Sequence, residues 1–173
     1  MIRTLDGLSP RVHPTAFVSE FAYVIGDVEI GEGSSIWPGA VIRGDMGKIT
    51  IGKFTCVQDN SVVHGDSDVV IGDHVVIGHR VLCHAKIVGD RVLLGNGTTV
   101  NDGVEIGDDS LLASGTMIVD DVKIPPGSLL VGVPGKVRGR VRKRHTELIK
   151  YYGDIYIEKT ERYKKQGNLE SPL

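Results

Sequence analysis

The sequence predicts an all-β solenoid, a parallel β-helix of hexapeptide repeats that is followed by a single C-terminal α-helix. A branched aliphatic residue returns every six positions from Val12 to Ile42, and after short insertions the same spacing continues to Leu130. Glycine often follows this residue, as in Ile30-Gly31. A period of six is typical of a β-helix in which each repeat forms one short strand and turn, and neighbouring coils bury a continuous aliphatic column.

Composition supports the same fold. The chain of 173 residues is long enough for one domain with its own core, and it contains 23 glycines but only 5% aromatic residues. This balance suits many tight turns and short strands, because glycine tolerates turn conformations and β-branched side chains pack well in strands. The rival interpretation is an ordinary β-sandwich. It would show turn signals about every 8–12 residues and no fixed aliphatic position.

The repeat stops at Gly132-Val133-Pro134-Gly135, which divides the chain into a hexapeptide-repeat domain, residues 1–135, and a C-terminal helix and tail that pack on it, residues 136–173. Residues from about 142 to 165 are rich in Lys, Glu, Leu, Ile and Tyr and predict the helix. One stripe of this helix can lie on the solenoid or on a neighbouring chain. Its members are Ile149, Tyr152, Tyr156 and Tyr163. We expect the tail from Gln166 to Leu173 to be frayed.

Charge and cysteine content argue against several function classes. The 20 basic and 22 acidic side chains give a net charge of −2, so no global field attracts the molecule to nucleic acid or to an anionic membrane. The basic run between Lys136 and Arg144 has no interleaved aromatic residues and is interpreted as a solvated face. Two cysteines are too few for a disulfide scaffold, and neither a cationic leader nor an apolar run of about 18 residues is present. We therefore expect a cytoplasmic protein without nucleic-acid or membrane partners.

Two histidines occupy equivalent positions in the hexad. His64 follows Val63 and His84 follows Cys83, so both lie in the slot after the inward residue and point outward to solvent or a partner chain. Their separation of 20 positions equals one 18-residue coil plus two extra residues, which stacks the two side chains one coil apart on the same face. Because adjacent strands are about 4.8 Å apart, the two imidazoles can converge on one cation with bonds of about 2.0–2.1 Å.

His79 lies in the next slot of the preceding face, so it points away from the pair formed by His64 and His84 and needs another subunit to reach it. If chains pack around a threefold axis, the face with that pair meets the neighbour's His79, which gives three protein ligands and an open position. Asp59 lies one coil below His79, with Gln58 beside it, so both would flank this interface. The hexad phase thus predicts a homotrimer with a metal site at each interface.

A polar column continues below the first histidine. Arg43 lies one coil below His64, and Asp45 follows two residues later, where it could pair with Arg43 or with an arginine across the subunit boundary. The two residues are either a structural ion pair or part of a catalytic site, and the spacing favours neither. The remaining histidines are interpreted as surface residues: His13, His74 and His145.

The residues named above lie in segments that resemble those of a known family. Four segments resemble the gamma-class carbonic anhydrase family, and the similarity covers nearly the whole chain: Ile42-Arg43-Gly44-Asp45, Val57-Gln58-Asp59-Asn60, Val63-His64 and Ile77 to His84. The resemblance implies a left-handed β-helix and a trimer that binds zinc, with iron or cobalt as alternatives, through two histidines of one chain and one of its neighbour. By resemblance these ligands are His64, His84 and, across the interface, His79.

The resemblance also implies a reaction, the reversible hydration of CO2 to bicarbonate. A cation at the site lowers the pKa of a bound water toward about 7, which makes that water a nucleophile toward CO2. Gln58 would orient the nucleophile, Asp59 would hold a ligand or partner side chain, and Arg43 with Asp45 would fix the interface. In some family members a helix tyrosine reaches the pocket, and Tyr156 is its candidate here.

The chain departs from the family pattern around this site. Well-characterised active members carry an acidic loop with a proton-shuttling glutamate where this chain has Gly65-Asp66-Ser67-Asp68, and a glutamate where it has Met46. Asn96 and Asn101 occupy two positions above the histidines that are usually apolar in the family. Proton transfer therefore needs another route, and the wall of the CO2 pocket is more polar.

Two other functions stay open. A hexapeptide acyltransferase or thioesterase acting on a coenzyme A substrate would share the repeat and an ending like Val131-Gly132-Val133-Pro134, but such enzymes generally rely on one catalytic histidine and no interface metal. A metal-stabilised trimeric scaffold, or a protein that binds a metal chelate, would be consistent with the missing acidic loop.

Overall fold

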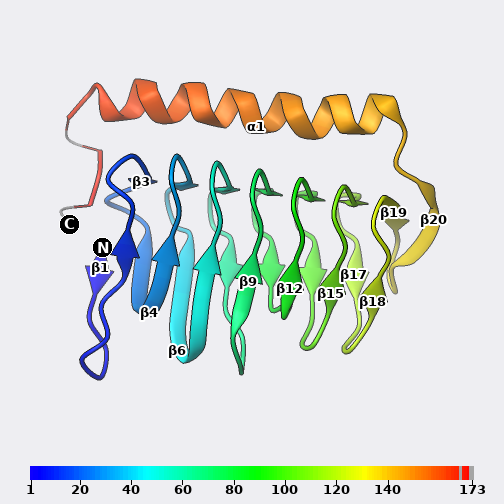
Figure 1. Cartoon of the computed structure of the whole chain (residues 1–173), viewed down its shortest axis with the longest axis horizontal. Coiled ribbons are helices and arrows are strands. Elements are labelled where there is room, and N and C mark those ends of the chain that lie inside the picture. Colours follow the sequence, from blue (N-terminus) through cyan, green and yellow to red (C-terminus); the bar gives the residue numbers. More distant parts are fainter. Residues whose placement is uncertain (168, 172–173) are drawn as a thin grey trace.

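The chain forms a parallel β-helix with one long helix, α1 (Lys143–Lys164), lying along its side (Figure 1). The computed structural model describes residues 1–167 and 169–171, so part of the predicted tail, residues 168, 172 and 173, lies outside the described residues. The fold class predicted from the six-residue period is confirmed.

Each coil contributes strands to three faces, and successive coils pair in parallel. The first face contains β1 (Ile2–Arg3), the first halves of β4 (Tyr23–Ile30) and β6 (Val41–Ile51), β8 (Val62–Val63), β11 (Leu82–Cys83), β14 (Thr99–Val100) and β17 (Met117–Ile118). The second face contains β2 (Arg11–Val12), the second halves of β4 and β6, β9 (Val69–Ile71), β12 (Ile87–Val88), β15 (Glu105–Ile106) and β18 (Lys123–Ile124). The third face contains β3 (Phe17–Val18), β5 (Ser35–Ile36), β7 (Cys56–Val57), β10 (Val76–Ile77), β13 (Leu93–Leu94), β16 (Leu111–Leu112) and β19 (Ser128–Val131).

The aliphatic core follows directly from the register of these strands. Val57 lies beside Ile77 on the third face, and Val63 lies beside Cys83 on the first, and all four side chains are fully buried. Every inward residue of the hexad from position 18 to position 130 belongs to this one cluster. Complete burial of such a side chain contributes about 1.5–3 kcal/mol, so the continuous column is the main source of stability for short strands that have few local contacts.

Helix α1 covers the third face, whose outward residues are apolar. A second cluster forms between the helix and this face, and its buried members are Phe17, Trp37, Cys56, Val76, Leu93, Leu111, Ile149 and Tyr156. The Trp37 ring lies at its centre, with ring centroids 5.0 Å from Tyr156 and 5.0 Å from Tyr163 in edge-on contacts. The helix therefore runs back along the solenoid, and Figure 1 shows its C-terminal end above the first coils.

Three details of the C-terminal region differ from the sequence-based expectation. Residues 136–140 form β20 (Lys136–Arg140), which turns back and pairs antiparallel with β19; no hexad pattern signals it, and it covers an edge of the last coil that would otherwise be open. Tyr152 is 38% exposed, so the buried side of the helix does not include it. The described part of the tail is anchored, because the Ser171 N–H donates to the Val18 carbonyl at 2.8 Å.

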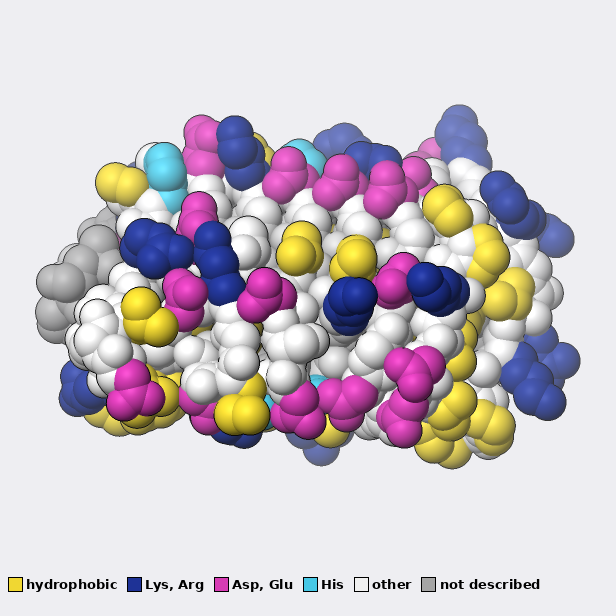
Figure 2. All heavy atoms as spheres, turned by 60° about the horizontal axis from the view of Figure 1, so that its bottom comes forward, with side chains coloured by type: hydrophobic (Ala, Val, Ile, Leu, Met, Phe, Trp, Pro, Cys, Tyr) yellow, Lys and Arg dark blue, Asp and Glu magenta, His cyan; other side chains and the backbone are white. Residues whose placement is uncertain are grey.

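The surface away from α1 carries both signs of charge, interspersed over the coils (Figure 2). Acidic and basic side chains of neighbouring coils pair here, as in the contact of 2.8 Å between Lys48 and Glu29 and that of 3.3 Å between Lys123 and Glu105. This distribution agrees with a nearly balanced net charge. Among the residues described, no helix has both the length and the apolar character needed to cross a membrane.

Candidate metal centre

Three side chains stack on the outer surface of the first face. Pairing of β6 with β8 and of β8 with β11 puts Arg43, His64 and His84 side by side, one coil apart, as the hexad phase predicts. The His64 Nδ1 and His84 Nε2 atoms are 2.7 Å apart, and the ring centroids are separated by 4.8 Å. The Arg43 Nη2 atom lies 3.2 Å from the same Nδ1 atom of His64. The solenoid therefore builds a pair of converging imidazoles from its coil spacing alone.

Carboxylates hold the far sides of both rings. His64 Nε2 is 2.8 Å from the Asp45 Oδ1 atom, and His84 Nδ1 is 2.5 Å from the Asp102 Oδ1 atom. Asp45 also forms an ion pair with Arg43 within the same chain. Burial raises the pKa of the Asp45 carboxyl, but hydrogen bonds from Arg43 and His64 outweigh this effect and keep the pKa below its usual value. Each ring is thus held by a carboxylate, the arrangement that orients metal-binding histidines.

The exposure of this pair differs from the expectation that both residues face solvent or a partner. The His64 side chain is only 9% exposed and that of His84 is 17% exposed. Their contacts with Arg43, Asp45 and each other cover them within a single chain. A position that points away from the solenoid core is therefore not necessarily a solvated position.

Hydrogen bonding makes this pair suitable for a cation. If His64 donates its Nε2 proton to Asp45 and His84 donates its Nδ1 proton to Asp102, the two nitrogens that face each other at 2.7 Å both present lone pairs. Two lone pairs at this distance repel unless a proton or a cation lies between them, and the Arg43 guanidinium, 3.2 Å from His64 Nδ1, offers a donor to one of the two. The donor set, two neutral imidazoles, is typical of zinc, iron and cobalt sites. The residues present therefore fit a divalent metal.

A second group of predicted site residues lies at the edge of the third face. Pairing of β7 with β10 places Asp59 beside His79, and the Asp59 Oδ2 atom is 3.1 Å from the His79 Nδ1 atom. The His79 side chain is 45% exposed, and its backbone N–H donates to the Asn96 side chain at 3.0 Å. Gln58 is buried beside this group. His79 is thus oriented by a carboxylate, and much of its ring faces outward.

Gln58, His79 and Asn96 of this group border a cavity of about 570 Å³ between α1 and the third face. Gln58, His79 and Tyr156 line it, together with Tyr152 and Lys159 of the helix. Burial, with a smaller effect from neighbouring Cys56, Asp59 and Tyr163, raises the pKa of the Tyr156 hydroxyl well above its usual value, so this group stays protonated. Its ring packs against Trp37, which gives Tyr156 a structural function whatever its hydroxyl does.

The two groups are separate within one chain. Among the described residues, the close group of metal-ligating side chains consists of His64, Asp66 and His84, and it leaves out His79. Asp59 and Gln58 lie with His79, whereas Arg43 and Asp45 lie with the histidine pair. Bringing all of the predicted site residues together would require a second copy of the chain.

Curated proteins with similar sequences have names that bear on this site. A carbonic anhydrase of Geobacillus kaustophilus is 40% identical over an alignment that spans 92% of this chain and 95% of that protein. Gamma carbonic anhydrase 1, mitochondrial, of Arabidopsis thaliana is 44% identical over 57% of this chain and 38% of its own length. The chain belongs to the gamma-class carbonic anhydrase family.

The gamma-class chain shares its fold with proteins of other names. Residues 9–44 match the family described as bacterial transferase hexapeptide (six repeats). The crystal structure of a hexapeptide transferase family protein from Anaplasma phagocytophilum superposes with a TM-score of 0.90 and 35% identity, and covers 94% of this chain and 98% of that one. The β-helix by itself therefore does not assign the reaction, which has to be argued from the site.

Sequence reasoning missed two acidic residues of this gamma-class site. Asp102, which binds the His84 ring, comes directly after Asn101, the residue that the register of β11 and β14 places one coil above His84, so the hexad phase could have placed Asp102 near that histidine. Asp66 belongs to the two-residue insertion between β8 and β9, and the hexad phase does not assign positions to inserted residues. Only the folded loop shows that it lies near both histidines.

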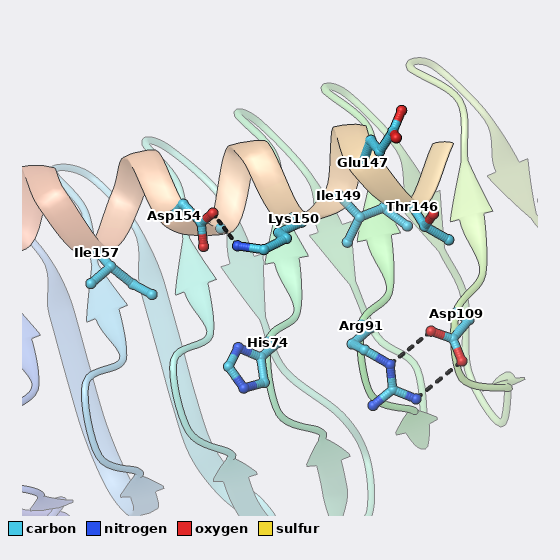
Figure 3. A pocket seen from close by; sticks show the side chains of 10 residues that line it. His74, Arg91, Asp109, Thr146, Glu147, Ile149, Lys150, Asp154 and Ile157 are labelled. Atoms are coloured by element: carbon cyan, nitrogen blue, oxygen red, sulfur yellow. Dashed lines mark hydrogen bonds and ion pairs between the residues drawn. The ribbon is translucent and has the colours of Figure 1, made fainter. Parts of the chain in front are cut away.

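A second cavity of about 440 Å³ lies under the other side of α1 and is not bordered by any predicted site residue (Figure 3). Its charged side chains pair with each other: Arg91 donates to both Asp109 oxygens at 2.7 and 3.0 Å, and Lys150 contacts Asp154. The hydrogen bond from Arg91, opposed by burial, keeps the pKa of the Asp109 carboxyl below its usual value. With these charges compensated, we assign this cavity no role in the chemistry of the gamma-class chain.

Proposed function

We propose that this chain catalyses the reversible hydration of CO2 to bicarbonate at a metal site shared by two subunits of a homotrimer. His64 and His84 of one chain and His79 of its neighbour would hold the metal, zinc or alternatively iron or cobalt. The observation that carries the proposal is the converging pair: two imidazole nitrogens 2.7 Å apart, each ring held on its far side by a carboxylate.

The separation of the two residue groups supports a shared site. His79 lies outside the close group of ligands in its own chain, yet its ring is oriented by Asp59 and nearly half exposed. A ligand that is held in place but directed away from its own chain's pair is suited to a neighbouring subunit. In a trimer, each interface would then contain one such pair and one His79.

Different side chains of this chain would hold the ligands, orient the water and form the pocket wall. Asp45 and Asp102 hold the two histidine rings, and Arg43 holds Asp45. A bound divalent cation would supply Lewis-acid chemistry, lowering the pKa of a water molecule toward about 7. Gln58, buried at the cavity that His79 borders, would orient this water toward CO2 through its side-chain amide. Tyr156 would form part of the apolar wall.

Metal analysis combined with a hydration assay on the same sample tests the reaction. Protein loaded with zinc, cobalt or, without oxygen, iron should accelerate CO2 hydration in a stopped-flow experiment, and the His64→Ala variant should not. A fully metallated trimer with no rate above that of the buffer would overturn the proposed reaction.

Mixed trimers test where the third ligand comes from. Under chelation strong enough to remove metal from each single variant, trimers mixed from His64→Ala and His79→Ala chains should regain metal, because some interfaces combine an intact pair with an intact His79. Trimers mixed from His64→Ala and His84→Ala chains should regain none, since every pair stays broken within its own chain. Equal recovery in both mixtures would show that the ligands are not divided in this way.

A second candidate is a metal-stabilised trimeric scaffold or binding protein. The specific observation in its favour is Met46, 65% exposed beside the first-face site, where the active members that the chain resembles carry a glutamate. The alternative of an acyltransferase or thioesterase draws on the fold that this chain shares with a protein named as a hexapeptide transferase. Slow metal exchange without hydration would favour the scaffold, and turnover of an acyl-coenzyme A without metal would favour the transferase.

A further inference from the structure

We infer that Asp66 is a third metal ligand supplied by the same chain as His64 and His84. A single chain would then hold a divalent cation through two imidazoles and one carboxylate, before any neighbour contributes His79. The inference shares its two histidines with the proposed function but depends neither on the trimer nor on CO2 as the substrate.

The Asp66 carboxylate lies close enough to both imidazoles to share a cation with them. One ligand atom from each of His64, Asp66 and His84 lies within 4.8 Å of the other two. In a tetrahedral site with bonds of about 2.0–2.2 Å, ligand atoms are roughly 3.3 Å apart. The two imidazole nitrogens must therefore move apart slightly, and the carboxylate must approach by at most about 1.5 Å, which rotation of an exposed aspartate side chain can provide.

Contacts with neighbouring residues hold the backbone of the loop that carries Asp66. The segment Gly65–Asp68 is held by close contacts although Asp66, Ser67 and Asp68 are exposed: a Cβ atom at Gly65 would lie 2.5 Å from the Val69 side chain. A Cβ atom at Gly47 would likewise clash with the backbone of Ser67. The Lys48 N–H donates to the Asp68 Oδ1 atom at 2.9 Å. The insertion is therefore held against residues 47 and 48, and it keeps the Asp66 carboxylate at the edge of the histidine pair.

The other carboxylates near the histidine pair already have partners. Asp45 binds His64 and Arg43, and Asp102 binds His84. Within the described part of the chain, the Asp66 carboxylate takes part in no ion pair or side-chain hydrogen bond, yet it belongs to the close ligand group. It is thus the carboxylate that can turn to a cation without breaking an existing contact.

The ligand set has consequences for the metal. Two histidines and one carboxylate on one side of the ion are typical of sites for non-haem iron(II), and the same set also binds zinc in hydrolytic enzymes. With the neighbour's His79 added, the cation would have four protein ligands, and a fifth coordination position would hold the water of the proposed reaction. We expect that a chain lacking His79 still binds metal, more weakly, and that this residual binding depends on Asp66.

Cobalt(II) titration of the full chain tests this dependence. In the His79→Ala background, Asp66→Asn should weaken cobalt binding at least tenfold and change the visible absorption of the bound ion, because an oxygen ligand is lost. Asp68→Asn is the matched control: it removes a carboxylate from the same loop but keeps an acceptor for Lys48, and it should change the affinity less than threefold. Circular dichroism and gel filtration establish that all variants have the same fold and assembly.

The outcomes separate this inference from the proposed reaction. If Asp66→Asn and Asp68→Asn bind cobalt as tightly as the His79→Ala parent, or if both weaken it equally, Asp66 is not a ligand. If His79→Ala and His64→Ala bind cobalt equally poorly, no single-chain site exists, and the inference also fails. An absence of CO2 hydration in the wild-type protein leaves these titrations unaffected, since they measure binding only.

Discussion

Removing the Asp102 carboxylate should weaken metal binding without unfolding the chain. The Asp102 side chain is 56% exposed. Among the described residues it makes one side-chain contact, the 2.5 Å hydrogen bond with His84 Nδ1. Loss of a carboxylate that orients a metal-binding histidine typically lowers affinity 10–100-fold, which corresponds to about 1.4–2.8 kcal/mol. Asp102→Asn keeps a neutral acceptor and should lie near the tenfold end of this range. Asp102→Ala keeps none and should lie near the hundredfold end.

Competition with a chelator of known zinc affinity measures the effect, and Asp6→Asn is the control because it alters an exposed aspartate in the first coil, several coils away from Asp102. Thermal unfolding of the metal-free variants should match that of the wild type, since Asp102 contributes no core contact. If Asp102→Ala retained zinc with wild-type affinity, the reasoning that this carboxylate sets the orientation and tautomer of His84 would be refuted.

Three further predictions concern the solenoid. Ile77→Ala, at a fully buried core position, should lower the free energy of unfolding by about 2–5 kcal/mol in urea titrations, and a loss below 1 kcal/mol would contradict the packed column. Gly26→Ala should abolish soluble expression or strongly lower the melting temperature, because Gly26 has a φ of +82° and an added Cβ would meet the Gly44 carbonyl; wild-type melting would contradict this. Burial raises the pKa of Cys56 to about 12 and that of Cys83 to about 11, so alkylating reagents should not label the folded chain at pH 9. Because the unfolded thiols ionise near pH 9.0, their contribution to stability should be constant below that pH and fall as pH rises from there toward 11, and rapid labelling of the folded protein would contradict the assignment.

The hexad phase predicted much of the candidate site because a solenoid converts sequence distance into spatial distance. Residues that share a slot one coil apart must lie side by side, so the contact of Arg43 with His64, and of His64 with His84, followed from counting positions. The same counting placed Asp59 beside His79. The counting works because each coil repeats the same three faces.

The hexad phase predicts nothing about residues that lie after the last repeat or in an insertion. β20 lies after the last hexad, and its antiparallel pairing depends on how the chain turns back at the end of the solenoid. Asp66 lies in an insertion, where the number of residues no longer determines direction. Tyr152 follows a helical period but not a hexad, and only the packing of α1 on the third face decides that it stays partly exposed.

For this protein the sequence alone determined the β-helix, its inward column and the stacked histidine pair, because the six-residue period fixes which positions are neighbours on successive coils. The helix beside the solenoid followed from the separate helical period after the last repeat. Only the tertiary structure decided that Asp45 and Asp102 hold the two rings, that His64 is nearly buried, and that the Asp66 loop reaches the same site. These features depend on side-chain direction and on loop packing between coils. A period of six residues specifies which backbone positions are neighbours, but it does not specify which way an exposed side chain turns.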